Sequence, residues 1–227
     1  MTTLKRGSRG EEVKQLQKKL NLVADGIFGW LTEEAVRDFQ KSKGLTSDGV
    51  VGAKTWAALG AASAQSKRRI TDIIIHCAAT PEGRDVKTAT IKGWHVAGRK
   101  WKDIGYHYVI ELDGTVHVGR DESVIGAHTT GYNAHSIGVC YVGGCAKDGK
   151  TPKDTRTPAQ KAAMERLVRE LLRKYPGAKV RGHRDYSPDL NGNGTVERCE
   201  WIKACPSFEV SDWLKETGLY KKQDYIN

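Results

Sequence analysis

Apolar residues in the first 60 positions recur at helical spacing in short segments. Val13, Leu16 and Leu20 fall on one face of the first segment, which predicts an amphipathic helix. Ser8 is expected to be its N-cap, and Glu11, three positions on, would complete a capping box. A second helix, presenting Ala35, Val36 and Phe39, is expected to end at Gly44.

An internal repeat runs through the same region. "DGIFGWLT" at residues 25–32 and "DGVVGAKT" at residues 48–55 share D-G-x-x-G-x-x-T at a spacing of 23. The glycines favour turns, and Thr32 and Thr55 are predicted N-caps of the helices that follow. Residues 1–60 are therefore predicted to form a small three-helix domain.

A change of composition separates this domain from the rest. "GAASAQSKRR" is small and polar and then basic, so residues 61–69 are interpreted as a linker with a solvated KRR run. All seven histidines and all five cysteines come after residue 70. Because these are the side chains best suited to catalysis, residues 70–227 are predicted to form the catalytic domain.

The catalytic domain begins with a buried-strand pattern. "ITDIIIHCAAT" carries an apolar run and delivers His76 near its end. "IGYHYVIELDGTVHVG" alternates around an Asp113-Gly114 turn, which predicts a β-hairpin with His107 on the face opposite Tyr106. "SIGVCYVGG" is a further strand.

The clearest helix follows these strands. Thr157 is its predicted N-cap, with Pro158 at the first position and Gln160 completing a capping box. After "PG", the short strand "AKVRGH" places His183 at a strand end. The predicted fold class is α/β, a mixed central sheet flanked by helices, with the small helical domain before it.

His76, His183 and Cys205 could converge on a metal. Two imidazoles and a thiolate leave zinc a fourth position for water, which is the composition of a catalytic site. The alternative is structural: a strand-end histidine often packs, and a lone cysteine behaves as a small buried hydrophobe. No C-x-x-C or H-E-x-x-H spacing decides between the two.

A glycine-rich insertion lies between His183 and Cys205. "DLNGNGTVERCE" fits the calcium-loop pattern D-x-[DN]-x-[DN]-G-x5-E, and "CEWIKA" could continue as an exiting helix. A weak structural Ca²⁺ site that braces the following segment is therefore predicted, against the alternative of a plain surface loop. Its predicted ligands are Asp189, Asn191, Asn193, the Thr195 carbonyl and Glu200.

Composition and charge narrow the function. The 227 residues have a mean hydropathy of −0.55, no apolar run long enough to span a membrane and no secretory signal, so cytoplasmic synthesis is expected. A net charge of +10 favours an anionic partner such as cell-wall polymer, an outer-membrane surface or nucleic acid without choosing among them, and of these three nucleic acid is not expected. Five cysteines argue against a disulfide framework.

Two sets of motifs resemble known families. "GSRGEEVKQLQKKL", "DGIFGWLTEEAVRDFQ" and "DGVVGAKTWAAL" resemble the peptidoglycan-binding domain found on bacterial and phage wall hydrolases. "IIIHCAAT", "WKDIGYHYVIELDGTVHVGR", "GAHTTGYNAHSIGVCYVGG", "RGHRD" and "KACPSF" resemble the zinc-dependent N-acetylmuramoyl-L-alanine amidases of the phage T7 lysozyme type, which share a fold with peptidoglycan recognition proteins.

This resemblance implies specific roles. Zn²⁺ would be held by His76, His183 and Cys205, and Tyr106 and Lys203 would be the other residues needed for activity. His128 would lie beside the zinc cleft, in contact with substrate or supporting a ligand, and Trp94 and His95 would either line that cleft or pack.

The implied function is cleavage of the amide between N-acetylmuramic acid and L-alanine. The leading interpretation is a monomeric, bacteriolytic phage endolysin that reaches the wall after its release from the cytoplasm. A non-catalytic recognition protein and a zinc peptidase acting on the stem peptide are the alternatives.

Overall fold

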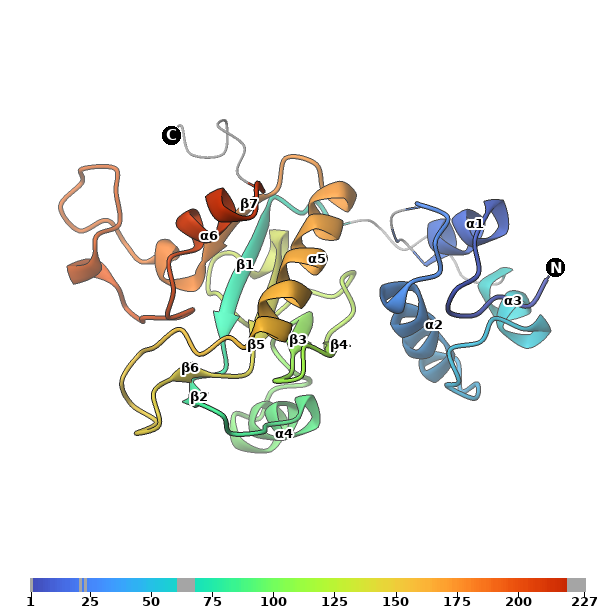
Figure 1. The fold of residues 1–227 in the computed structure, drawn as a ribbon, viewed down its shortest axis with the longest axis horizontal. Coiled ribbons are helices and arrows are strands. Elements are labelled where there is room, and N and C mark those ends of the chain that lie inside the picture. Colours follow the sequence, from blue (N-terminus) through green and yellow to red (C-terminus); the bar gives the residue numbers. More distant parts are fainter. Residues whose placement is uncertain (1, 21, 23, 61–67, 220–227) are drawn as a thin grey trace. The chain divides into compact units, whose positions relative to one another are not determined.

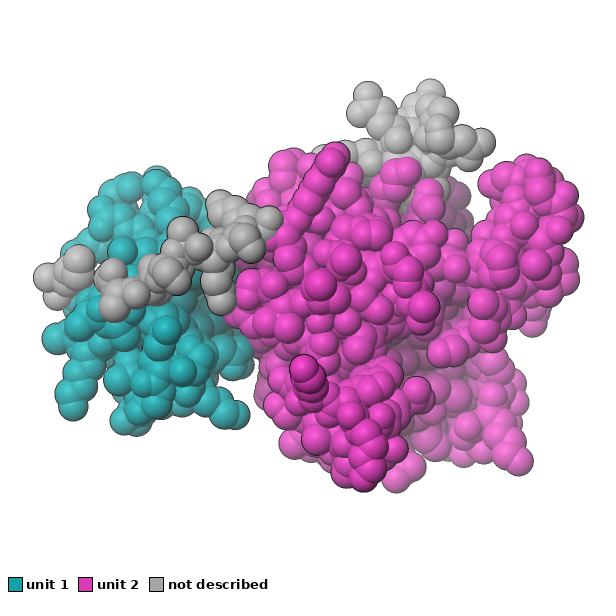
Figure 2. Space-filling view, turned by 180° about the vertical axis from the view of Figure 1, so that it is seen from behind, with its two compact units in different colours: residues 1–66 teal, residues 67–227 magenta. Residues whose placement is uncertain are grey.

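The computed structural model describes residues 2–20, 22, 24–60 and 68–219. The chain divides into two compact units, residues 1–66 and residues 67–227 (Figure 2). Among the described residues, no helix has the length and apolar character needed to cross a membrane.

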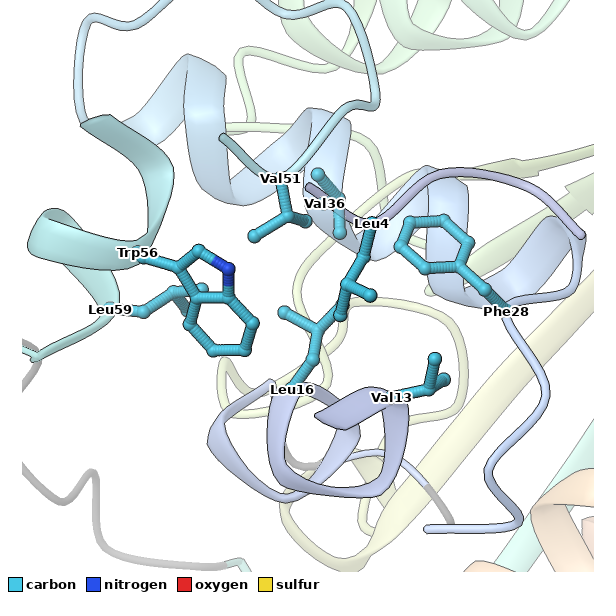
Figure 3. Close-up of a cluster of buried hydrophobic side chains, with 8 residues drawn as sticks. All are labelled: Leu4, Val13, Leu16, Phe28, Val36, Val51, Trp56 and Leu59. Carbon is cyan, nitrogen blue, oxygen red and sulfur yellow. The ribbon is translucent and has the colours of Figure 1, made fainter. Parts of the chain in front are cut away.

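The first unit contains three helices, α1 (Glu11–Lys19), α2 (Trp30–Ser42) and α3 (Ala53–Gly60). Their apolar faces meet in one cluster, because each helix is too short to bury its stripe alone. Figure 3 shows this cluster, which consists of Leu4, Val13, Leu16, Phe28, Val36, Val51, Trp56 and Leu59.

The sequence repeat of this unit has a physical basis in two buried glutamines. The Gln17 side chain donates to Asp25 Oδ1 (2.7 Å) and Thr32 Oγ1 (3.2 Å) and accepts from the Gly26 amide (2.9 Å). Gln40 makes the same three bonds to the second copy, with Asp48, Thr55 and Gly49. Each repeat therefore supplies the partners that a buried amide requires.

These bonds explain why the predicted N-caps were wrong. Thr32 and Thr55 lie inside the first turns of α2 and α3, where the glutamines bind their hydroxyls. Ser8 does not cap α1, since its hydroxyl accepts from the Lys5 amide (3.1 Å) and Gly10 occupies the N-cap position. The glycine backbone there has φ +113°, a conformation that side chains resist.

The second unit is built on a five-stranded sheet with the order β4-β3-β5-β1-β7 (Figure 1). The central strand β1 (Asp72–Cys77) is parallel to β5 (Ser136–Tyr141) on one side and to β7 (Lys179–Gly182) on the other. β3 (Tyr108–Ile110) is parallel to β5, and β4 (Val116–Val118) is antiparallel to β3. The predicted mixed sheet and its β-hairpin are confirmed.

The long helix α5 (Pro158–Lys174) crosses the sheet in Figure 1. Its predicted capping box is present, because Thr157 and Gln160 bond reciprocally. The Gln160 side chain also donates to the carbonyls of Ile110 (3.2 Å) and Val142 (2.9 Å), which fastens the helix start to the sheet. A shorter helix, α6 (Val210–Glu216), packs beside β7.

Short elements complete the unit. They are β2 (Thr80–Pro81) paired with β6 (Gly144–Cys145), α4 (Thr88–Gly93), the π-helix Trp94–Gly98, and the 3-10 turns Asn133–His135, His183–Tyr186 and Arg198–Glu200. The exiting helix predicted after the insertion is wrong. Only the last 3-10 turn forms there, and Trp201 is extended.

Candidate metal centre

The parallel strands bring two histidines together. His76 is the fifth of six residues in β1 and is only 1% exposed. β7 lies beside β1 in register up to the Ile75–Gly182 pair, so His183 emerges next to His76 at the same edge of the sheet. Their ring centroids are 4.6 Å apart.

Cys205 reaches this edge on the segment that returns from the insertion. The Cys77 amide donates to its Sγ (3.2 Å), and the Arg184 amide donates to its carbonyl (2.9 Å). The Tyr141 hydroxyl holds the next carbonyl, that of Pro206, at 2.7 Å. These bonds place Cys205 Sγ 3.8 Å from His76 Nδ1.

The three donors fit a zinc ion. One ligand atom from each of His76, His183 and Cys205 lies within 4.8 Å of the others. Tetrahedral Zn–N and Zn–S bonds of about 2.05 and 2.3 Å separate nitrogen from sulfur by about 3.6 Å, close to the observed 3.8 Å. In the part of the chain that the structure describes, no other three His, Cys, Asp or Glu residues gather in this way.

The electrostatics suit metal ligation. Burial, with the charges of nearby His128, His183 and Lys203, holds the pKa of His76 well below its usual range. Burial and Lys203 lower the pKa of His183 to about 4. Both imidazoles are thus neutral, the form that binds metal. Burial raises the pKa of the Cys205 thiol, because the charged thiolate is poorly solvated there. A bound metal cation would stabilise the thiolate.

His128 contacts His76. Its Nδ1 is 3.0 Å from His76 Nε2, and its Nε2 is 3.3 Å from Ser136 Oγ. His128 is 9% exposed, and its ring sits between Gly126 and Gly138. A Cβ atom at either glycine would come within 2.5 or 2.7 Å of the ring, so only glycine leaves room for it. Of the two roles expected for His128, this placement fits support of the ligand.

Tyr106 also packs near His76. Its half-buried ring is 5.1 Å from the His76 ring and 5.4 Å from the His95 ring. Burial, and then the neighbouring Cys140 thiol, raise the pKa of Tyr106 above its usual range. His95 is buried and accepts the Gly105 amide on Nδ1 (3.1 Å), whereas Trp94 is 40% exposed.

A cavity of about 170 Å³ opens beside the centre. Lys203, which is exposed, lines it together with His183. The sequence did not predict the other lining residues, although the two threonines directly after His128 could have drawn attention to themselves. These residues are Thr129, Thr130, Tyr186, Ser187 and Ile202.

Side chains of the insertion, residues 189–200, accept hydrogen bonds from the backbone amides of the same loop. Asp189 accepts the amides of Gly192 and Gly194 (both 2.7 Å). The buried Glu200 accepts the amides of Leu190 (2.8 Å), Asn191 (3.2 Å) and Glu197 (2.8 Å). The Asn191 and Asn193 side chains each accept the amide two residues on, that of Asn193 and that of Thr195. Calcium binding stays a prediction.

The family of the chain follows from comparison with known proteins. A family model described as N-acetylmuramoyl-L-alanine amidase matches residues 66–199, and one described as a putative peptidoglycan binding domain matches residues 9–59. The chain therefore belongs to the N-acetylmuramoyl-L-alanine amidase family. The amidase match ends before Lys203 and Cys205, so it does not bear on those two residues.

Particular relatives agree with this family. The endolysins of Escherichia phage T7 and Enterobacteria phage T3 are each 41% identical to the chain, over 67% and 70% of it and 91% and 95% of their own lengths. The solved N-acetylmuramoyl-L-alanine amidase LysC from Clostridium intestinale URNW is 25% identical, with a TM-score of 0.51 over 69% of this chain and 91% of LysC. The predicted amidase fold is confirmed.

Proposed function

We propose that the chain is a zinc-dependent endolysin that cleaves the amide between N-acetylmuramic acid and L-alanine in peptidoglycan. One observation carries the proposal: the ligand atoms of His76, His183 and Cys205 lie within 4.8 Å of one another, beside a cavity lined by Lys203. A zinc ion held by these three donors would keep a fourth position for water, beside a space for substrate.

A zinc ion held there supplies Lewis acidity toward water and toward the scissile carbonyl. The Lys203 ammonium stabilises the negative charge that develops on the carbonyl oxygen, an effect worth roughly 3–4 kcal/mol for a well-placed donor. Tyr106 holds the attacking water or relays a proton. The water oxygen ends in the lactyl carboxylate as the carbon–nitrogen bond breaks, and both water protons end on the departing L-alanine amine, which leaves as an ammonium group.

Residues around the centre take supporting roles. His128 orients His76 through the 3.0 Å contact between their ring nitrogens. His95 packs against Tyr106 and acts through it. Trp94, with its exposed ring, contacts the polymer.

The first unit binds peptidoglycan and keeps the enzyme at its substrate. The protein is made in the host cytoplasm and acts on the wall after release, as a monomer and without nucleic acid. Light scattering of the purified chain tests the monomer, since a dimer would double the mass.

The proposal includes a structural calcium ion in the insertion. Asp189, Asn191, Asn193, Thr195 and Glu200 would hold a Ca²⁺ ion that stabilises the loop before Lys203. Their pattern in twelve consecutive residues supports this role, and the few carboxylates among them favour weak affinity.

Product analysis tests the proposed reaction. Digestion of purified sacculi should release muramyl lactyl groups and create new L-alanine N-termini, and Cys205→Ser should abolish both. Cys199→Ser is the matched control, because Cys199 is an exposed cysteine of the same segment. New N-termini at other stem residues would indicate the zinc peptidase, and binding without products would indicate the recognition protein.

A further inference from the structure

The arginine before the amidase sheet is built into the catalytic unit, contrary to the expectation that the KRR run is solvated. Arg68 is half-buried, whereas Arg69 is exposed. A guanidinium has five N–H donors, and the Arg68 side chain uses each of them on a backbone carbonyl. Nε donates to Ala134 (3.1 Å), Nη1 to Glu122 (2.8 Å) and Val124 (3.0 Å), and Nη2 to Asn133 (2.6 Å) and Ser136 (2.9 Å).

These carbonyls lie on both sides of the turn that carries His128. They belong to residues 122–124 and residues 133–136. In the described part of the chain, no β-sheet pairing joins these two segments. Inside the turn, Asn133 Oδ1 accepts the amides of His128 (2.8 Å) and Thr129 (2.9 Å). Arg68 therefore ties together the two ends of a segment whose middle is already closed.

The His128 ring follows this backbone closely. Gly126 and Gly138 leave it no spare space, and its remaining nitrogen faces Ser136, whose carbonyl Arg68 also binds. A shift of either segment would move the ring relative to His76. His107 braces the same region, since its Nε2 contacts the Val124 carbonyl (3.1 Å) and its Nδ1 accepts the Gly138 amide (2.9 Å).

We propose that Arg68 is a positioning residue for the metal centre, holding His128 against the ligand His76 by fixing the carbonyls on both sides of the His128 turn. The inference rests on the proposed function, because it assumes that His76 carries the metal. The functional amidase unit then begins at or before Arg68, inside the stretch that its composition marks as linker.

Zinc affinity of the full chain tests this role, measured by competition with a chromophoric chelator. Loss of a residue that orients a metal-bound histidine typically weakens binding about 10- to 100-fold. Arg68→Ala, which acts at one remove, should weaken it about 10-fold. Arg69→Ala is the matched control and should leave the affinity unchanged. Arg68→Lys should lie between the two, because an ammonium offers three donors without the planar fork.

A double-mutant cycle separates positioning from general stability. In a His128→Ala background, Arg68→Ala should have no further effect on zinc affinity. Wild-type affinity in Arg68→Ala, or the same loss with and without His128, would overturn the proposal. If Arg68→Ala does not fold, Arg68→Lys carries the test, and wild-type affinity in that variant would overturn it. Absence of zinc binding in the wild type would instead refute the proposed function.

Discussion

Two candidate metal sites share the segment between His183 and Cys205, and they are built in opposite ways. The candidate zinc centre would take its donors from positions 76, 183 and 205, which the parallel strands and the bonds around Cys205 bring together. The insertion takes all its predicted donors from residues 189–200, and its bonds join residues at most ten positions apart.

The difference shows what each site depends on. The sheet and the segment around Cys205 hold the candidate zinc donors close together. The predicted calcium donors are instead held by hydrogen bonds from the amides of their own loop. In the described part of the chain, the two candidate sites meet at the neck of the insertion, which we define as residues 184–187 and 201–202. There the Ile202 amide donates to Ser187 Oγ (3.1 Å), and the Arg184 guanidinium lies 4.0 Å from the Trp201 ring centroid. Four predictions, from the largest effect to the smallest, test this separation.

Removal of the sulfur ligand should have the largest effect. Cys205→Ser should lower kcat/KM on peptidoglycan by more than about 1000-fold, because a serine hydroxyl is a poor zinc ligand. The turbidity of a sacculus suspension measures the loss of activity, and metal analysis measures the loss of bound zinc that should accompany it. Activity near the wild-type level in Cys205→Ser, with Cys199→Ser as reference, would mean that the thiolate does not hold the metal.

Removal of the cavity ammonium should cost less. Lys203→Ala should lower kcat about 100- to 1000-fold with zinc content unchanged, because Lys203 is assigned to the oxyanion and not to the metal. Lys150→Ala, at an exposed turn, controls for loss of one positive charge. Loss of zinc from Lys203→Ala would show that the residue supports the centre, in conflict with the role given to it.

Calcium should affect stability more than chemistry. At 1 mM, Ca²⁺ should stabilise the wild type by about 1 kcal/mol and raise its Tm by a few degrees, as expected for a weak site. Glu200→Gln should abolish that response, and Asp148→Asn, an acidic residue of another exposed turn, should keep it. Calorimetry with zinc in excess checks this, and an unresponsive wild type would leave the insertion as a plain loop.

The neck of the insertion should give the smallest effect. Ser187→Ala removes one hydrogen bond and should cost about 0.5 kcal/mol of unfolding free energy. Zinc content should stay at the wild-type level, because the bonds to the Cys205 and Pro206 carbonyls remain. A loss of zinc comparable to that in Cys205→Ser would show that the two sites are coupled.

Sequence patterns predicted the elements whose cause is local. The capping box of Thr157, the hairpin at Asp113-Gly114 and the strand-end position of His183 each depend on a few neighbouring residues, and the structure contains them. The predicted N-caps Thr32 and Thr55 failed because a distant residue competes for each hydroxyl. Thr32 has the chemistry of a cap, but Gln17, fifteen positions earlier, uses its hydroxyl.

Arg68 was missed for the same reason. The composition around it is that of a linker, and its five acceptors lie at least 54 positions away along the chain. Backbone carbonyls carry no sequence signature, so only the folded chain reveals them. The proposed support of the candidate metal centre is thus harder to predict than its proposed ligands, which are marked by residue type.

Cobalt substitution tests the central claim, that His76, His183 and Cys205 hold a metal, most directly. Co²⁺ in place of zinc reports a coordinated thiolate through a sulfur-to-cobalt charge-transfer band. We expect this band in the wild type and in Cys199→Ser, and its loss in Cys205→Ser. A band that survives Cys205→Ser, or a wild type that binds cobalt without one, would contradict the assignment.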